Sequence, residues 1–183
     1  MAGEPAATQG LRHAPATIVL HWLSAVLVAS LWTIGKTIDF APNGPLRIDY
    51  RSLHMLLGVT LGIVLVIRLA WRTIRGGMLP ALDHGLLLFI ARATHWLLYA
   101  LMLVTVGLGV LNVWVRGDWI FNLVHVAQLV PGDRAFVRQI GDWHALVADA
   151  VLVVAGLHSA AALFHHFVLH DLTLRRMLPW SSR

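Results

Sequence analysis

The segment Trp143–Leu169, WHALVADAVLVVAGLHSAAALFHHFVL, decides the fold. Its 27 residues contain no acidic or basic side chain except Asp149 and the histidines, and such a stretch can cross a bilayer as one helix. His144 and His158 lie fourteen residues apart in it. At about 100° and about 1.5 Å per residue, their rings share one helix face and lie about 21 Å apart along the axis. One ring therefore falls near each edge of a hydrocarbon core about 30 Å thick, which predicts two metal centres stacked across a membrane.

The composition of the chain places it in the membrane class and restricts its chemistry. Of its 183 residues, 58% are hydrophobic and only 13% are charged, a balance that soluble domains rarely show. The chain has no cysteine, which excludes disulfides, thiolate metal sites, iron–sulfur clusters and covalent CxxCH haem attachment. The net charge of +5 comes from basic residues at the ends of apolar segments, so membrane lipid is the expected partner and nucleic acid is not.

Three more apolar segments precede Trp143, and together the four predict an all-α, integral membrane four-helix bundle. They are Ala16–Gly35, Ser52–Trp71 and Ala93–Val115, the last of which can begin as early as His84. We divide the chain into an N-terminal lead (1–15), the four-helix domain (16–170) and a basic tail (171–183). Between the third and fourth spans, Asp118–Val130 mixes aromatic and polar residues and predicts a short amphipathic helix at the membrane surface.

The orientation of the bundle is predicted from its charges. Four spans place both termini on one side, and that side carries eight of the fourteen lysines and arginines. Because basic residues favour the cytoplasmic side, both termini are expected in the cytoplasm. His54 and His144 then lie near the outer face, and His21 and His158 lie near the inner face.

The two histidine pairs fit a cytochrome b. An imidazole on each side of a haem iron fills both axial positions, leaves no open site for a substrate and suits outer-sphere electron transfer. A single histidine in an apolar helix is more often a hydrogen-bonded structural residue, but four at matched depths favour two non-covalent b haems. Other histidines compete for these roles: His84, His95, His165, His166 and His170 near the inner face, and His125 near the outer face.

Other polar residues in the spans each have two interpretations. Arg68 lies at the inner depth, where it either pairs with a haem propionate or extends to the interface as an ordinary arginine. Arg92 and His95, at the start of the third span, either contact a propionate or quinone or are interface residues. Asp149 points away from the haem face. It either hydrogen-bonds a neighbouring helix, with Asn112 as a candidate partner, or delivers protons to a reduced quinone.

Two glycines and three arginines are ambiguous in the same way. Gly58 and Gly62 form a GxxxG pair that serves either close helix packing or the approach of a flat cofactor to the backbone. Arg116, Arg134 and Arg138 belong to the outer loop. They either steer an anion such as superoxide toward the outer haem or are part of a solvated loop, which is the slightly favoured interpretation.

Several segments resemble the prokaryotic cytochrome b561 family, over nearly the whole chain beyond about residue 10. They are IVLHWL (18–23), SLHMLLG (52–58), IRLAWR (67–72), DWHALVADAVLVVAGLHSAAALFHH (142–166) and DLTLRRMLP (171–179). The resemblance implies a four-helix bundle of the bacterial inner membrane with two b haems that exchange electrons with a quinone. The ligands that it implies are His21, His54, His144 and His158, the same four that the spacing selects. Some family members are similar to superoxide oxidase, which takes electrons from superoxide at the outer face and passes them to ubiquinone.

The sequence therefore favours a dihaem cytochrome b that moves electrons between a small outer-face donor and ubiquinone, as a superoxide:ubiquinone oxidoreductase. The absence of a fifth span favours a free-standing protein over a quinone-linked cytochrome b subunit of a periplasmic dehydrogenase. An alternative of another class is a small proton-coupled transporter that uses histidines and Asp149 without a cofactor. A zinc protein is disfavoured, because no acid or cysteine accompanies the histidines at ligand spacing.

Overall fold

The computed structural model describes residues 12–75 and 85–179. Four long helices make up most of them: α1 (Pro15–Thr37), α2 (Pro45–Arg75), α3 (Gly85–Arg116) and α4 (Arg134–Phe167). The shorter elements are the 3₁₀ helices η2 (Ile38–Phe40) and η3 (Arg175–Met177) and the strands β1 (Trp119–Ile120) and β2 (Val124–His125). All four long helices are long and apolar enough to cross a membrane, which confirms the predicted all-α four-helix bundle. Most of the predicted lead, His84 and the end of the tail lie outside the described residues.

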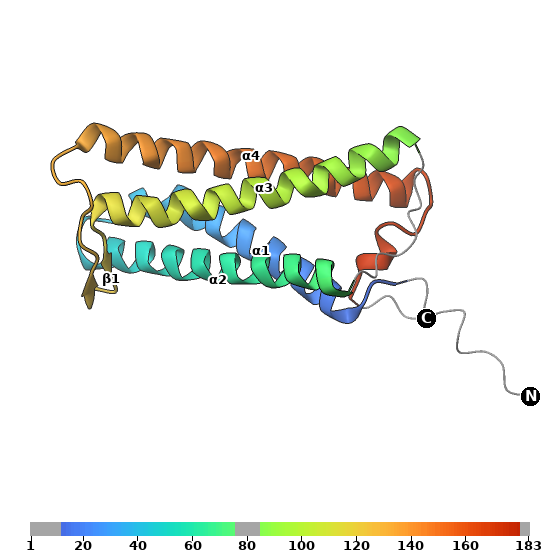
Figure 1. Ribbon diagram of the computed structural model, residues 1–183, viewed down its shortest axis with the longest axis horizontal. Helices are drawn as coiled ribbons and strands as arrows, with labels where there is room; N and C mark the ends of the chain where they lie inside the picture. Colours follow the sequence, from blue (N-terminus) through green and yellow to red (C-terminus); the bar gives the residue numbers. More distant parts are fainter. Residues whose placement is uncertain (1–11, 76–84, 180–183) are drawn as a thin grey trace, which may run out of the picture.

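The helices form two layers, α1 with α2 and α3 with α4 (Figure 1). The α1–α2 connection and the β1–β2 segment lie at one end of the bundle, which we call the hairpin end (Figure 1). The start of α1 and the end of α4 lie at the opposite end, which we call the terminal end. There the amide of His13 donates to the carbonyl of Arg176 (3.3 Å), and Nε1 of Trp22 donates to the carbonyl of Met177 (2.7 Å). The two ends of the described chain therefore meet on one side of the bundle, as an even number of spans requires.

Most large apolar side chains point outward, which is the pattern of a membrane bundle. Val19, Val66 and Val153, for example, are each 62% exposed, and helices that are apolar all round need lipid when no other helix covers them. The main cluster of buried residues draws on all four helices: Leu27, Leu31, Leu61, Val64, Leu65, Tyr99, Met102 and Val151. On α4 this core falls between the two histidines of the fourth span. It therefore separates the two histidine depths with apolar side chains.

The helices extend beyond the predicted spans because polar turns lengthen their ends. The helix α2 begins at Pro45, seven residues earlier than predicted, and α4 begins at Arg134, nine residues earlier. Proline suits the first helical turn, where its missing N–H is not needed. Asp133 caps α4 by accepting a hydrogen bond from the amide of Phe136 (2.9 Å), which satisfies one of the free N–H groups of the first turn. Hydropathy marks only the part of a helix inside the hydrocarbon, so it misses such turns.

The prediction of an amphipathic helix over Asp118–Val130 is wrong. This segment contains a small antiparallel hairpin in which β1 pairs with β2. Its turn residues Phe121 and Asn122 have positive φ angles of 49° and 57°, as a tight hairpin turn requires. The fully buried hydroxyl of Ser52 on α2 accepts a hydrogen bond from the amide of Phe121 (2.7 Å). A contact with a helix distant in sequence thus holds this segment, and local composition does not reveal such a contact.

Candidate cofactor sites between the helix layers

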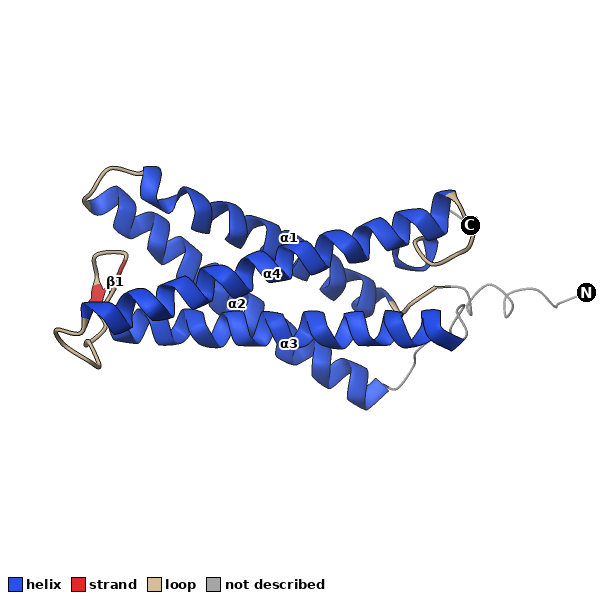
Figure 2. Ribbon diagram, turned by 90° about the horizontal axis from the view of Figure 1, so that it is seen from above, coloured by secondary structure: helices blue, strands red, loops and turns tan. Residues whose placement is uncertain are grey.

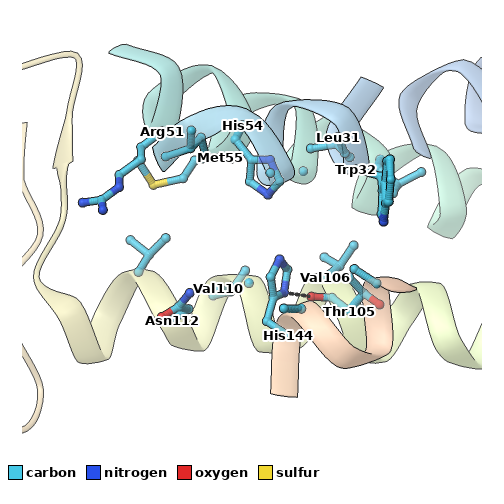
Figure 3. Close-up of a pocket in the computed structure, with 18 of the residues that line it drawn as sticks. Leu31, Trp32, Arg51, His54, Met55, Thr105, Val106, Val110, Asn112 and His144 are labelled. Carbon is cyan, nitrogen blue, oxygen red and sulfur yellow. Dashed lines mark hydrogen bonds between the residues drawn. The ribbon is translucent and has the colours of Figure 1, made fainter. Parts of the chain in front are cut away.

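At the hairpin end, one histidine from each layer faces the other across a cavity. His54 lies on α2 and His144 on α4, and their ring centroids are 6.1 Å apart with the planes at 80°. Figure 3 shows the two rings pointing toward each other from opposite layers. The cavity has a volume of about 360 Å³, and all four helices line it with mostly apolar side chains such as Leu31, Met55 and Val106. The structure thus brings together the two residues of the predicted outer pair.

The backbone of α3 determines which nitrogen of His144 carries a proton. Nδ1 of this ring lies 3.0 Å from the carbonyl oxygen of Thr105, and the dashed line in Figure 3 joins the two atoms. Because a carbonyl only accepts hydrogen bonds, Nδ1 is the donor and Nε2 keeps a free lone pair. Metal-ligating histidines are commonly held in this way. Nδ1 of His54 is buried and has no hydrogen-bond partner within the described part of the chain. Each ring therefore has a nitrogen available for a ligand.

The two glycines of the GxxxG pair have different surroundings. A Cβ added to Gly62 would lie 3.2 Å from Cγ1 of Val106 on α3, so this glycine permits close packing of α2 on α3. A Cβ added to Gly58 would meet no described atom within 4 Å, and Gly58 lines the cavity. The pair therefore combines close helix packing at Gly62 with open space in the cavity at Gly58.

Charged residues surround the cavity at the hairpin end. Lys36, Arg51 and Arg116 line it together with Asp39 and Asp118. The carboxylate of Asp118 is shared between Arg51 (3.6 Å) and Arg116 (3.4 Å). Basic side chains therefore outnumber acidic ones by three to two in the cavity lining, and Lys36 is also paired with Asp149. Of the three loop arginines considered for steering an anion, Arg116 alone lines this cavity.

Asp149 joins α4 to α1, and the predicted partner Asn112 is wrong. The Asp149 carboxylate accepts hydrogen bonds from Nε1 of Trp32 (2.8 Å) and Nζ of Lys36 (2.9 Å). Figure 2 shows α4 crossing over α1, and this crossing turns the Asp149 face of α4 toward α1. Asn112, on α3, lines the cavity, and its Oδ1 is buried with no hydrogen-bond partner among the described residues. The prediction of a hydrogen bond to a neighbouring helix is confirmed, but the helix is α1.

At the terminal end, histidines from three helices meet. The ring centroid of His158 on α4 lies 6.3 Å from that of His21 on α1 and 5.1 Å from that of His95 on α3. The two residues of the predicted inner pair are therefore close to each other. His95, predicted to be near a propionate or quinone or to be an interface residue, lies closer still to His158. Three rings thus meet where the sequence predicts two ligands.

Arg68 takes part in the same cluster. Its guanidinium donates to Nδ1 of His21 (3.4 Å) and lies over the ring of Tyr99, 5.3 Å from the centroid. Because arginine cannot accept a hydrogen bond, Nδ1 of His21 is the acceptor and Nε2 carries the proton. To bind a metal through Nε2, His21 must move its proton from Nε2 to Nδ1, and this requires that the hydrogen bond from Arg68 to Nδ1 breaks. Arg68 points into the bundle and not toward the interface, whereas Arg92 is exposed and lies outside the cluster.

The other candidate histidines that the structure describes lie outside the two groups. His165 pairs with Asp171 (2.5 Å), and His166 and His170 line a small cavity of about 220 Å³ that also includes Asp171. Burial alone would raise the pKa of Asp171, but hydrogen bonds, first of all from His165, outweigh it and hold that pKa below its ordinary value. His125 lies in the hairpin. None of these four rings joins the His54–His144 pair or the terminal cluster in the described structure.

Comparison with known proteins places this arrangement in a family. Residues 12–180 match the family model described as prokaryotic cytochrome b561. The chain belongs to this family. It is similar to "Cytochrome b561 homolog 2" of Escherichia coli (strain K12), with 33% identity covering 93% of each chain. It is also similar to "Probable superoxide oxidase CybB" of Yersinia pestis (29% identity, 88% of this chain and 93% of that protein) and to "Cytochrome b562" of Cereibacter sphaeroides (28% identity, 88% and 91%).

Membership of the cytochrome b561 family confirms the resemblance that the short motifs indicated and makes the chain a multi-pass membrane cytochrome. The family implies haem b, and the residues at the hairpin end fit such a group. Two imidazoles face each other in an apolar cavity, the proton of His144 is held on Nδ1, and Nδ1 of His54 is buried without a partner among the described groups. The terminal cluster offers the same donor type, provided that Arg68 releases His21.

Several contributions to the hairpin-end site were missed in the sequence. The carbonyl of Thr105 belongs to the backbone, so no residue type signals it. Arg51 lies three residues before His54, and helical spacing alone places the two on one face. Trp32 and Lys36 are four residues apart at the end of the first span and also share a face. Helical spacing thus indicates which of these side chains share a face. It does not indicate which residues of other helices they contact.

Proposed function

We propose that this cytochrome carries two b haems and moves electrons between a small donor at the hairpin end and ubiquinone at the terminal end. The observation that carries the proposal is the pairing of histidines at two depths of one bundle. The helix α4 contributes His144 to one group and His158 to the other, and different helices complete each group. We assign His54 and His144 as the residues that would hold one haem, and His21 and His158 as those that would hold the second.

The residues around the second haem have supporting roles in this proposal. His95 and Arg68 lie beside the His21–His158 pair, where they would contact a propionate or the quinone. Arg92 is exposed and would act at most from the edge of the bundle. A b haem, when bound between two histidines, would supply reversible one-electron transfer. The chain itself holds the rings at two depths and fills the space between them with the apolar core.

Superoxide is the donor that the hairpin end suits best. One relative is named as a probable superoxide oxidase, and the cavity mouth of this chain carries an excess of basic residues, which attracts a small anion. The reaction balances when two superoxide anions each lose one electron and become oxygen, while ubiquinone gains two electrons and two protons and becomes ubiquinol. In this proposal the protein lies in the bacterial inner membrane with the hairpin end outside and both termini in the cytoplasm.

The transporter hypothesis receives less support from the site geometry. Asp149 is held by Trp32 and Lys36 at the α1–α4 crossing, so its carboxylate already has two donors. A proton carrier needs a carboxyl group that is free to change its protonation state in the pathway. The other alternative, a cytochrome b subunit of a periplasmic dehydrogenase, has the same two haems. It differs from the proposed function only in its electron donor, which would be the dehydrogenase and not superoxide.

The first test is a reduced-minus-oxidised absorbance spectrum of the purified protein, with haem quantified per chain. We expect two low-spin b haems per chain, and a value of one or zero contradicts the two-haem proposal. In proteoliposomes that contain ubiquinone, superoxide added outside is expected to yield ubiquinol. If the dihaem protein does not oxidise superoxide and purifies with a soluble dehydrogenase, the subunit function replaces the proposed one.

A further inference from the structure

Two glycines lie directly against the rings of the hairpin-end histidines. A Cβ added to Gly109 on α3 would lie 3.2 Å from Cε1 of His144 and 3.6 Å from its Nδ1. A Cβ added to Gly35 on α1 would lie 3.3 Å from Cε1 of His54 and 3.8 Å from its Nδ1. Separations of 3.2 and 3.3 Å are shorter than ordinary carbon–carbon contact. Each ring therefore packs against a glycine of a neighbouring helix: His144 of α4 against α3, and His54 of α2 against α1.

This placement distinguishes the two glycines from the others in the helices. A Cβ added to Gly58, Gly107, Gly141 or Gly156 would meet no described atom within 4 Å, and one added to Gly62 would meet an aliphatic side chain. No glycine in the described ranges lies against a ring of the terminal cluster. Because glycine weakens a helix relative to alanine, a glycine inside a helix needs a local reason. For two of them, the reason that the structure offers is an imidazole.

Gly109 contacts the same His144 ring that donates a hydrogen bond from Nδ1 to α3. The acceptor of that bond is the carbonyl of Thr105, four residues before Gly109 on the same face of α3. The ring of His144 thus lies along one turn of α3, with its Nδ1–H on the carbonyl and its Cε1 against the glycine. A side chain at Gly109 would push the ring away from this carbonyl and weaken the bond that leaves Nε2 unprotonated.

At Gly35 the ring contact is not accompanied by a hydrogen bond of Nδ1 like that of His144. Nδ1 of His54 has no hydrogen-bond partner in the described residues, so packing has a larger share in deciding where the ring lies. The neighbouring Lys36 binds Asp149 of α4, and this bond fixes the end of α1 against the helix that carries His144. The end of α1 therefore contacts one ring and anchors the helix of the other.

We infer that Gly35 and Gly109 are positioning residues that set the place and orientation of the His54 and His144 rings. The inference rests on the proposed function, in which these two rings would hold one haem. The orientation of an axial imidazole influences the electronic structure and the potential of the iron that it binds. The two glycines thus act on one haem and leave the haem of the terminal end unchanged.

The experiment compares Gly35→Ala, Gly35→Val, Gly109→Ala and Gly109→Val in the full-length, detergent-solubilised protein. Haem per chain, the electron paramagnetic resonance spectrum of the oxidised haems and the midpoint potential of each haem are measured. We expect the alanine variants to keep two haems and to shift the spectrum and potential of one. We expect the valine variants to lose one haem of two. Gly107→Val on α3 and Gly156→Val on α4 are matched controls, because both glycines are exposed and have open space.

The outcomes separate the inference from the function on which it rests. If all four variants have wild-type spectra and potentials, the inference is overturned. The proposed function still stands in that case, provided that the parent protein contains two haems. Changes confined to the terminal-end haem also overturn the inference. Fewer than two haems in the parent protein contradict the proposed function itself. If a valine variant does not fold, the alanine variant at the same position tests the inference. Alanine is the better helix former, so this variant is expected to fold.

Discussion

His144 and His21 show how the protonation site of one imidazole depends on its neighbour. His144 donates from Nδ1 to the carbonyl of Thr105, so Nε2 is free to bind a metal. His21 accepts at Nδ1 from Arg68, so Nε2 carries the proton until Arg68 moves. The hairpin-end pair therefore has a nitrogen free for a metal, whereas the terminal cluster needs a movement of Arg68 first, although both groups consist of histidines and share α4.

Replacement of either hairpin-end histidine is expected to remove one haem and leave the other. His54→Ala and His144→Ala each delete one axial ligand of the proposed pair, and a haem that is held non-covalently by one ligand is lost easily. Haem per chain is therefore expected to fall from two to one. The control is His125→Ala, which alters an exposed hairpin histidine and is expected to retain both haems. Retention of two haems in both ligand variants contradicts the assignment.

Replacement of Arg68 is expected to lower the midpoint potential of the terminal-end haem. Loss of a positive charge stabilises the oxidised iron relative to the reduced iron. At a separation of about 10 Å and an effective dielectric constant of about 20, one charge is worth about 1.7 kcal/mol, or tens of millivolts for one electron. A redox titration of Arg68→Gln measures the shift, with Arg92→Gln as the exposed control. An unchanged or raised potential in Arg68→Gln shows that this charge does not act on the haem.

At the scale of the helices, α1 and α4 are joined at their crossing by a polar contact. Trp32 and Lys36 both donate to Asp149, and the Lys36 and Asp149 side chains are each 46% exposed. In a membrane bundle this exposure faces lipid or headgroups, so a charge without its partner is unfavourable there. The pair therefore helps to hold the two layers together along the edge of the hairpin-end cavity.

Removal of one member of this ion pair is expected to destabilise the bundle more than removal of both. Asp149→Ala leaves the Lys36 ammonium without its carboxylate, whereas Asp149→Ala combined with Lys36→Met leaves no charge at the crossing. The temperature of thermal unfolding, followed by the haem absorbance, is expected to fall in the single variant and to recover partly in the double variant. Additive effects of the two changes show that the groups do not interact. Both variants are expected to contain the full complement of haem.

At the scale of the whole molecule, the excess of basic residues at the cavity mouth is expected to control how fast an anionic donor reacts. Arg51→Gln and Arg116→Gln reduce this charge and are expected to slow the oxidation of superoxide several-fold at low salt, because steering of an anion depends on local potential. The dependence of the rate on ionic strength is also expected to weaken. Arg138→Gln serves as the control, since this arginine does not line the cavity. Equal rates for all three variants indicate that these charges do not guide the donor.

The sequence by itself determined the fold class and the depth of the histidines. Apolar stretches of about 20 residues satisfy their backbone hydrogen bonds in lipid only as helices, so four such stretches predict a four-helix bundle. The rise of about 1.5 Å per residue then places His144 and His158 at different depths of one helix. Both conclusions depend on quantities that are local to one segment, and for this reason the sequence was sufficient.

The tertiary structure decided which side chains meet. It added His95 to the terminal cluster, gave Asp149 its partners on α1, turned residues 118–130 into a hairpin and placed Gly35 and Gly109 against imidazole rings. These contacts depend on how far and at what angle helices distant in sequence cross, and on where each helix is rotated about its axis. Hydropathy and spacing carry no information about that rotation, because lipid accepts many apolar faces equally well.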